Sequence, residues 1–415
     1  MEYLLYRALS RINRVGWLLT AAAVAAAAPP QSQTLCGQVP TIAAELTQIS
    51  KLPLKHPVPC DFITKEKVNE FLRKRVQEDS KPEEIRAEEL TLKKFGFVPQ
   101  DFDLAKSTID LLTEQAAAFY DYNKKKLFIT ETSSKEPQEP VLAHELSHAI
   151  ADQNFNLAKF VKAGRKSDDG STARLAVMEG QATWLMSEYL ARKNGQSLES
   201  SPDLVAAMSS TSDAGDGSQF PVYDKSPLYL RLTLIFPYTK GMLFQDAVLR
   251  RDKEASFSEV FRNPPLSTQQ ILHPDKYFSG VKPTDPQVPD PHLHGYKGLV
   301  GGSLGELEHQ ILLEQYGSKE ESADIAPHWR GCNFELLENK KAGRVVLLYA
   351  SEWDSEESAR KFFTAYRETM QKKWRKMTVA SETADRITGS GDDGNFVLER
   401  KGALVTSMEG LDSVN

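Results

Sequence analysis

Two histidines stand four residues apart in EPVLAHELSHAIADQNF, the stretch from Glu139 to Phe155. Residues four apart lie on one face of a helix, roughly 6 Å from each other, so His144 and His148 can reach one metal ion. Glu145 is rotated by about 100° around the helix axis, where it can flank that ion and take a proton from an activated water molecule. This is the HExxH pattern of zinc peptidases, and it predicts a zinc site with its own general base.

The same stretch has a simpler interpretation, which is a helix with two surface histidines. With 8 histidines in the chain, chance would produce an HExxH on the order of once in a hundred such sequences. The helix is mostly apolar around the pair, with Leu142, Leu146 and Ile150, and is therefore expected to be buried. Because buried imidazoles require polar partners, this context favours a metal site.

A catalytic zinc usually has three protein ligands and one open position, and no third histidine follows soon after the pair. The candidate is Glu179 in RLAVMEGQATWLM, at the edge of the apolar face of a predicted helix. A lone carboxylate on a buried face is costly unless it is paired or binds a cation, and Gly180 leaves room for another helix to approach. An ion pair with Arg174 is the alternative, and Asp168 and Asp169 are further candidate ligands.

Peptide hydrolysis also requires a hydrogen-bond donor to the developing oxyanion. Tyr238 in FPYTKG and His273 in ILHPDKY are the candidates. A buried tyrosine whose hydroxyl only caps a backbone group is the simpler interpretation of Tyr238 and is slightly favoured. His292 and His294 in DPHLHGY could bind a second ion, although alternating histidines in a proline-rich loop are more often solvated.

Periodicity and turn residues predict the elements that position these residues. Helices are expected over TKEKVNEFLRKRVQ, PEEIRAEELTLKKFG and DLAKSTIDLLTEQAAA, and AFYDYNKKKLFIT is expected to form a hairpin. The helix with the histidines should begin near Pro140, and ARLAVMEGQATWLMSEYLARK is typical of a long helix. Residues 194–226 are predicted to be a long loop or lid, and the helix that follows should break near Pro237.

The pattern changes in the last third of the chain. Residues 282–303 hold many prolines and glycines, which predicts a linker or wrapping loop. A helix, the strands NFELLE and RVVLLYAS, a helix in SEESARKFFTAYRETMQKKW and two strands in GNFVLERKGALVTSMEG follow. Together they indicate an α+β module of roughly a hundred residues.

Two stretches carry a resemblance to a known family: LAHELSHAIADQNF, and VMEGQA roughly thirty residues later. They resemble the gluzincin metallopeptidases, thermolysin-like enzymes among them, which combine HExxH with a glutamate from a following helix. The run from LLTEQAAAFYD to VMEGQATWLM is more closely similar to a group of poorly characterised exported bacterial proteins with a HELxHAxxDQ signature. The resemblance covers roughly residues 60–280 and, more weakly, the C-terminal module. The spacing to Glu179 is longer than in thermolysin.

The resemblance implies a role for each residue of the pattern. His144, His148 and Glu179 would bind Zn²⁺, and Glu145 would act as general base and then as general acid. Asp152, one turn beyond His148, would hold a ligand imidazole or, as an equal alternative, only solvate the helix end. The hairpin would supply a strand beside the cleft, where an extended peptide could pair by backbone hydrogen bonds.

The predicted fold class is α+β, with a mainly helical zincin-like catalytic region and a small edge sheet, followed by a C-terminal α+β module. The expected divisions are a signal peptide at 1–28, a mainly helical N-terminal segment at 29–110, a zincin-like metallopeptidase region at 111–303 and the C-terminal α+β module at 304–415.

The first residues of the chain predict export. Arg7, Arg11 and Arg14 precede the uncharged run VGWLLTAAAVAAAA, an order typical of a secretory signal peptide. The run is shorter than the roughly 20 residues that span a bilayer, so a retained membrane anchor is the alternative. The protein is expected in the periplasm or outside the cell.

The three cysteines are compatible with an oxidising compartment. Cys36 and Cys60 could close a short loop and leave Cys332 free, although three unpaired thiols are an equal alternative.

The net charge of −6 argues against a nucleic-acid binder, which would normally show a basic face. The sequence therefore predicts an exported zinc-dependent peptidase with a peptide or protein substrate, no nucleic-acid partner and no stable membrane insertion after signal cleavage. The alternatives are a non-catalytic gluzincin-like envelope or binding protein, and a hydrolase that acts on another kind of amide. The intact Glu145 favours catalysis.

Overall fold

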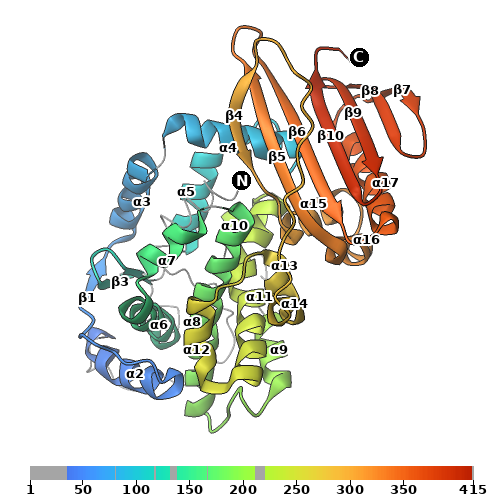
Figure 1. The fold of residues 1–415 in the computed structure, drawn as a ribbon. Helices are drawn as coiled ribbons and strands as arrows, with labels where there is room; N and C mark the ends of the chain where they lie inside the picture. The colour runs from blue at the N-terminus through green and yellow to red at the C-terminus, as the bar shows by residue number, and fades with distance from the viewer. Residues whose placement is uncertain are drawn as a thin grey trace.

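The structure is a computed structural model that describes residues 35–79, 81–115, 118–130, 138–165, 167–210 and 220–413. The predicted signal peptide lies outside these ranges. Within them, no helix has the length and apolar character needed to cross a membrane. The described chain forms a mainly helical region beside a C-terminal sheet with its own helices (Figure 1). The predicted α+β fold class is therefore confirmed.

Three long helices and a small sheet organise the helical region. The long helices are α6 (Gln138–Phe155), α8 (Asp168–Lys193) and α11 (Leu228–Asp252). The expected hairpin forms from β2 (Ala118–Asp121) and β3 (Lys126–Thr130), and β1 (Cys60–Ile63) pairs with β3 in parallel. The remaining helices are α2 (Leu35–Ser50), α3 (Lys65–Asp79), α4 (Pro82–Phe95), α5 (Leu104–Gln115), α7 (Leu157–Gly164), α9 (Pro202–Ser210), α10 (Pro221–Lys225), the 3₁₀ turn η2 (Lys253–Ala255), α12 (Ser256–Arg262), α13 (Thr268–Leu272) and α14 (Pro274–Phe278).

Helices α8 and α11 meet backbone to backbone at a pair of glycines. A Cβ added to Gly180 would lie 2.1 Å from the carbonyl carbon of Gly241, and one added to Gly241 would lie 2.2 Å from the carbonyl oxygen of Ala176. Packed interiors leave no room for such additions, so any side chain here would push the helices apart. The expected close approach at Gly180 is confirmed, and the neighbouring helix is α11.

Two local predictions between residues 194 and 252 are wrong. Helix α11 runs without a break through Pro237, which is buried. Packing against α8 therefore outweighs the lost backbone N–H of the proline. The predicted long loop contains α9 and α10, whereas residues 211–219 lie outside the described ranges.

A seven-stranded sheet dominates the C-terminal part of the chain, in the order β4-β5-β6-β10-β9-β8-β7, and all of its neighbouring strands are antiparallel. The strands are β4 (Lys297–Gly302), β5 (Trp329–Asn339), β6 (Arg344–Trp353), β7 (Thr378–Glu382), β8 (Arg386–Gly391), β9 (Gly394–Lys401) and β10 (Leu404–Leu411). The helices are α15 (Glu306–Tyr316), α16 (Lys319–Ile325), the 3₁₀ turn η3 (Ala326–His328) and α17 (Glu356–Lys373).

The four predicted strands and the long helix α17 are present, but three further strands were not predicted. Strand β7 is exposed along its whole length, so it shows no alternation of apolar and polar residues. Strand β4 contains three glycines, in KGLVGG, and glycine is depleted in strands. It lies within the stretch predicted as a linker, so the sheet begins before residue 304, the expected start of the C-terminal module.

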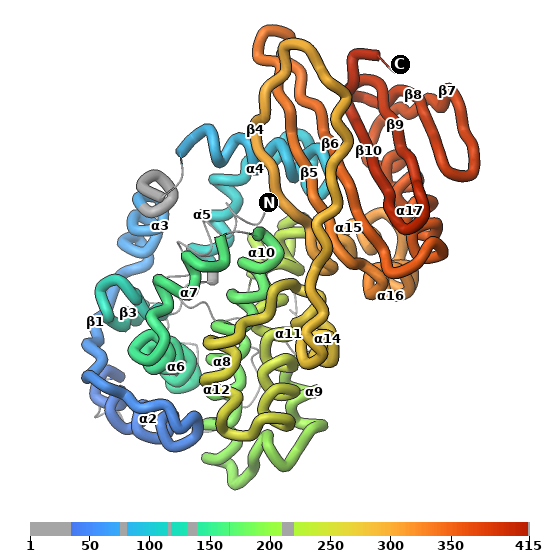
Figure 2. Tube along the Cα trace, in the orientation of Figure 1, coloured from blue at the N-terminus to red at the C-terminus, as the bar shows by residue number. Residues whose placement is uncertain are grey.

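Both faces of the large sheet are covered. Tyr349 of β6 stacks on Tyr366 of α17 with ring centroids 5.3 Å apart. Val346 and Leu348 point to the opposite face, as alternation along a strand requires, and pack there with Val288. The proline-rich stretch that carries Val288 runs along this face from α14 to β4 (Figure 2). It is a wrapping segment, as its prolines predict.

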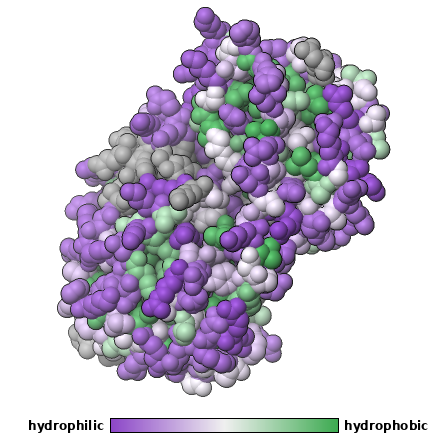
Figure 3. All heavy atoms as spheres, in the orientation of Figure 1, coloured by the Kyte–Doolittle hydropathy of each residue, from purple (hydrophilic) through white to green (hydrophobic). Residues whose placement is uncertain are grey.

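A disulfide joins Cys36 at the start of α2 to Cys60 at the start of β1, whereas Cys332 is free and buried. The first of the two cysteine alternatives is therefore the one present. Hydrophilic side chains dominate the face of the molecule shown in Figure 3, and hydrophobic side chains are visible over the C-terminal sheet.

Candidate metal centre

The two histidines of α6 and Glu179 of α8 converge in the interior. The Nε2 atoms of His144 and His148 lie 3.1 Å apart. Glu179 Oε2 lies 3.1 Å from Nε2 of His144 and 3.2 Å from Nε2 of His148. The structure thus brings the three residues together, and Glu179 contacts the histidines rather than Arg174, whose guanidinium stacks on Phe160.

The size of this triangle matches a tetrahedral zinc site. With Zn–N and Zn–O distances of about 2.0–2.1 Å, tetrahedral ligand atoms lie roughly 3.3 Å from each other. Among the described residues, His144, His148 and Glu179 are the one group of three or more histidine, cysteine or acidic side chains whose ligand atoms all lie within 4.8 Å. The donor set and its geometry therefore fit one metal ion.

Burial and charge set the protonation of these ligands. Burial lowers the pKa of His144, against the opposing effect of Glu179, and this favours the neutral imidazole that binds metals. Burial alone would raise the pKa of Glu179, but His148 and His144 outweigh it and lower that pKa to about 2. The carboxylate is therefore ionised, and its second oxygen, Oε1, is buried without a partner among the described residues.

Glu145 lies beside this group with one oxygen held and the other unpaired. The backbone N–H of Tyr120 donates a 2.8 Å hydrogen bond to Glu145 Oε2. Glu145 Oε1 is buried and has no hydrogen-bond partner within the described ranges. Burial and the charge of Glu179 raise the pKa of Glu145 well above its usual value. A carboxyl group with a raised pKa beside a metal site is suited to accept and return a proton.

The local fold explains how polar groups come to lie at this depth. His144, Glu145 and Glu179 have no exposed surface, and His148 is 4% exposed. Apolar side chains of α6 fill the space around the histidines, and the glycine contact next to Glu179 lets α8 lie against α11. Solvent therefore does not reach His144, Glu145 or Glu179, and the site is closed in this conformation.

Of the two candidate oxyanion donors, the structure places only Tyr238 beside the histidines. Its ring lies 5.9 Å, centroid to centroid, from the ring of His144, and its side chain is buried. His273 lies between α13 and α14, and its Nε2 is 2.7 Å from Glu306 Oε1 of α15. His273 therefore contacts the C-terminal module and does not join the group formed by the three candidate ligands.

Asp152 does not hold a ligand imidazole. It accepts hydrogen bonds from the Tyr120 hydroxyl at 3.0 Å, from Lys125 at 2.5 Å and from the backbone N–H of Leu157 at 3.1 Å. The Asp152 carboxylate therefore holds the β2–β3 hairpin and the start of α7. It neither orients a ligand imidazole nor merely solvates the end of α6. Nδ1 of His144 has no partner in the described part of the chain.

The remaining candidates lie elsewhere. Asp168 and Asp169 begin α8, where Asp168 accepts from the backbone N–H of Ser303 and Asp169 from that of Thr268. His292 is exposed and pairs with Asp290. Glu179 occupies the position of a third ligand, so neither Asp168 nor Asp169 takes that role.

Sequence reasoning missed two contributions to the site, the backbone N–H of Tyr120 and the close approach of Gly241. Neither could be predicted from the sequence. Every residue except proline carries a backbone N–H, so residue type does not identify this donor. A single glycine in YTKGM does not indicate a helix contact, because glycine occurs in helices for several reasons.

Comparison with known proteins bears on the C-terminal module alone. A family model described as a domain of unknown function (DUF8575) matches residues 297–414. The matched range begins at β4 and holds the seven-stranded sheet with its helices, so it contains none of the candidate metal ligands. No curated protein and no solved structure matches the chain.

Proposed function

We propose that this chain is an exported zinc-dependent peptidase of the gluzincin type. The observation that carries the proposal is the convergence of His144, His148 and Glu179 next to an unpaired oxygen of Glu145. Three protein ligands with a base beside them are the donor set of a catalytic zinc, whereas structural zinc sites usually have four protein ligands.

The roles of this chain's residues follow from their contacts. When bound, zinc would lower the pKa of water to about 7 and polarise a substrate carbonyl. Glu145 would accept a proton through its unpaired Oε1 and return it to the leaving amine, while the N–H of Tyr120 fixes the orientation of the carboxylate. A cation next to Glu179 would offset the repulsion that raises the pKa of Glu145. Tyr238, beside His144, is the proposed donor to the oxyanion.

The closed site favours the second candidate, a gluzincin-like binding or envelope protein without turnover. His144, Glu145 and Glu179 are inaccessible to solvent, and a peptide must reach them for hydrolysis. Catalytic sites that close over their substrates open on microsecond to millisecond timescales. The two candidates therefore differ in whether the protein opens, and this is a measurable property.

Export is part of the proposal and has two supports. The chain begins with the pattern of a signal peptide, and the Cys36–Cys60 disulfide fits an oxidising compartment. Fractionation of cells that express the full chain, followed by detection of the processed form, tests this part separately.

The decisive experiment compares the purified chain with Glu145→Gln. Zinc content would be measured by elemental analysis after dialysis, and turnover with an unstructured protein and a quenched fluorescent peptide library. We expect one zinc per chain in both proteins and a loss of turnover of roughly 10²- to 10⁴-fold in the variant, since a general base contributes about that much.

Glutamine at position 145 can still accept the hydrogen bond from Tyr120, so the variant isolates the proton transfer. Equal turnover in both proteins would remove Glu145 as the base. A parent that binds zinc but cleaves no substrate would favour the binding protein. A parent that binds no zinc would contradict the peptidase and leave the binding protein as the leading candidate.

A further inference from the structure

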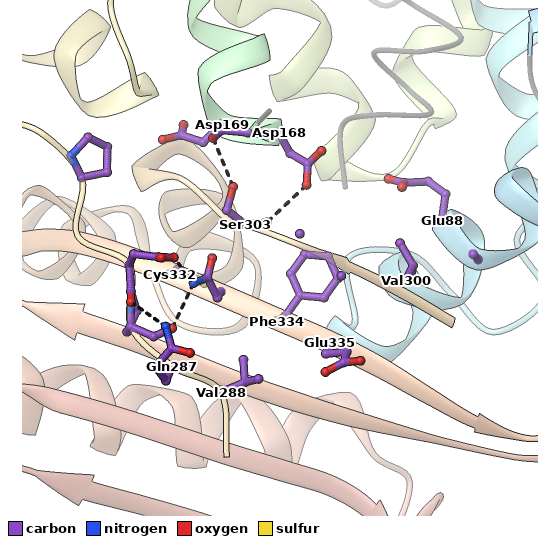
Figure 4. A pocket seen from close by; sticks show the side chains of 18 of the residues that line it. Glu88, Asp168, Asp169, Gln287, Val288, Val300, Ser303, Cys332, Phe334 and Glu335 are labelled. Atoms are coloured by element: carbon purple, nitrogen blue, oxygen red, sulfur yellow. Dashed lines mark hydrogen bonds between the residues drawn. The ribbon is translucent and has the colours of Figure 1, made fainter. Parts of the chain in front are cut away.

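A cleft lies where the helical region meets the C-terminal sheet, and it includes none of the candidate metal ligands. Its volume is about 700 Å³, within the usual range of ligand sites. Its walls come from α4, the start of α8, strands β4 and β5, and the proline-rich segment 283–288 (Figure 4).

The described walls of this cleft are strongly acidic. Seven carboxylates line it against a single guanidinium, that of Arg165. A concave surface with charges of one sign concentrates ligands of the opposite sign. The acidic residues are Glu83, Glu84, Glu88, Asp168, Asp169, Asp285 and Glu335.

Three of the lining side chains are deeply buried and carry unsatisfied polar atoms. Glu88 is 2% exposed, Asp169 is 3% exposed and Trp329 is 1% exposed. Glu88 Oε1, Asp169 Oδ2 and Trp329 Nε1 have no hydrogen-bond partner among the described residues. A buried polar atom left in this state destabilises the fold, and a ligand that pairs with it removes that cost. The cleft therefore offers two carboxyl oxygens and one indole N–H that a ligand can satisfy.

The Asp168 carboxylate is held in place beside Glu88 (Figure 4). Glu88 points toward Asp168 across the opening (Figure 4). Asp168 Oδ2 accepts a 3.2 Å hydrogen bond from the backbone N–H of Ser303. A Cβ on Gly302 would lie 2.2 Å from that same oxygen, so only glycine lets Asp168 occupy this position. The arrangement is fixed before any ligand arrives, which lowers the cost of binding.

The shape of the cleft selects an organic cation over a metal ion. No three of its described carboxylates bring their oxygens within 4.8 Å of one another, as a metal site built from protein ligands alone would require. Leu299, Val300 and Phe334 also line the space, and they can cover an aliphatic stem. The ring of Phe334 adds a favourable surface for a cation. The unsatisfied N–H of Trp329 requires an acceptor, such as a peptide carbonyl.

We propose that this cleft binds a lysine or arginine side chain of a polypeptide, with the cationic group between Glu88 and Asp168 and the stem against Phe334 and Val300. The inference does not depend on the proposed peptidase activity, because the cleft and the metal centre share no described residue.

The test is isothermal titration calorimetry of the purified chain with blocked pentapeptides that differ only in the central residue. We expect saturable binding with lysine or arginine at the centre and none with norleucine, which keeps the stem and lacks the charge. Burial keeps a proton on Glu88 in the free chain, and a bound cation replaces that proton. Glu88→Gln has no proton to release, so it should weaken binding by roughly tenfold or more. Gly302→Ala should weaken it as well, because it displaces Asp168 without removing charge.

Glu320→Gln on α16, which does not line the cleft, is the matched control and should leave the affinity unchanged. Absence of saturable binding by both basic peptides to the folded parent would overturn the proposal. Equal binding of the norleucine peptide would overturn it too. Stronger binding of spermidine or Mg²⁺ than of either peptide would show a site for free cations and contradict the assignment to a polypeptide.

Discussion

The backbone N–H of Tyr120 donates a 2.8 Å hydrogen bond to Glu145, which joins the proposed base on α6 to the edge strand β2 of the small sheet. The base is therefore oriented by a backbone group that no substitution except proline at position 120 removes. A glutamine at position 145 keeps this contact, and a change in the hairpin would instead act on the orientation of the base.

The first prediction concerns the third ligand. Glu179→Gln should lower zinc affinity by at least roughly a hundredfold, because losing a direct ligand costs more than the 10- to 100-fold typical of residues that only support ligands. Zinc content after dialysis and competition with a chromophoric chelator measure this. Glu188→Gln, on the same helix and bonded to Arg192 and Leu198, is the control and should retain zinc. Equal loss in both variants would indicate a damaged helix rather than a missing ligand.

The second prediction separates the two candidate oxyanion donors. Tyr238→Phe should lower kcat by about 10²-fold with zinc content unchanged, because a preorganised donor typically contributes that much. His273→Gln should leave kcat unchanged, since His273 contacts Glu306. Steady-state kinetics with one peptide substrate measures both. A loss of kcat confined to His273→Gln would reverse the assignment.

The third prediction concerns the contact between α8 and α11. Gly180→Ala should destabilise the fold by about 1–3 kcal/mol, as overpacked interiors do, since the added methyl group meets the backbone of Gly241. Chemical denaturation measures the change. Gly241→Ala should have a similar effect, and the double variant should be less unstable than the sum, because one separation of the helices relieves both clashes. Full additivity would show that the two glycines do not face each other.

The fourth prediction concerns the Cys36–Cys60 disulfide, which closes a loop with a sequence separation of 24. A loop of this length predicts a stabilisation of about 3 kcal/mol. The variant with serine at both positions should show a lower midpoint of thermal unfolding, and a reductant should lower the midpoint of the parent but not of that variant. A reductant effect that persists in the variant would point to Cys332.

The fifth prediction concerns pH and Glu88, whose pKa burial raises from 4.5 to about 8. Between these two pH values the folded state keeps a proton that the unfolded state loses, so stability falls as pH rises through the window. Glu88→Gln should make this decline shallower and stabilise the chain at pH 8 by on the order of a few kcal/mol. Thermal unfolding from pH 5 to 9 measures it. The fall in stability with pH should not vanish in this variant, because burial also raises the pKa of Asp169 to about 8. An unchanged slope would show that Glu88 is solvated.

Local sequence determined the elements that carry the chemistry. The spacing of His144 and His148 places both rings on one helix face. The hydrophobic alternation of β5, the apolar run of β6 and the capped start of α17 at Ser355 are equally local. These features depend on backbone geometry within a few residues, so a single sequence specifies them and predicts the α+β class.

Only the tertiary structure decided how these elements meet. The distance from Glu179 to His144 depends on how α8 lies against α6, and the continuity of α11 at Pro237 depends on its packing. The partners of Asp152 and His273 come from distant segments, as does the acidic cleft between α4 and β4. Such contacts arise from the packing of surfaces that lie far apart along the chain, and the residue types at either end do not by themselves specify them.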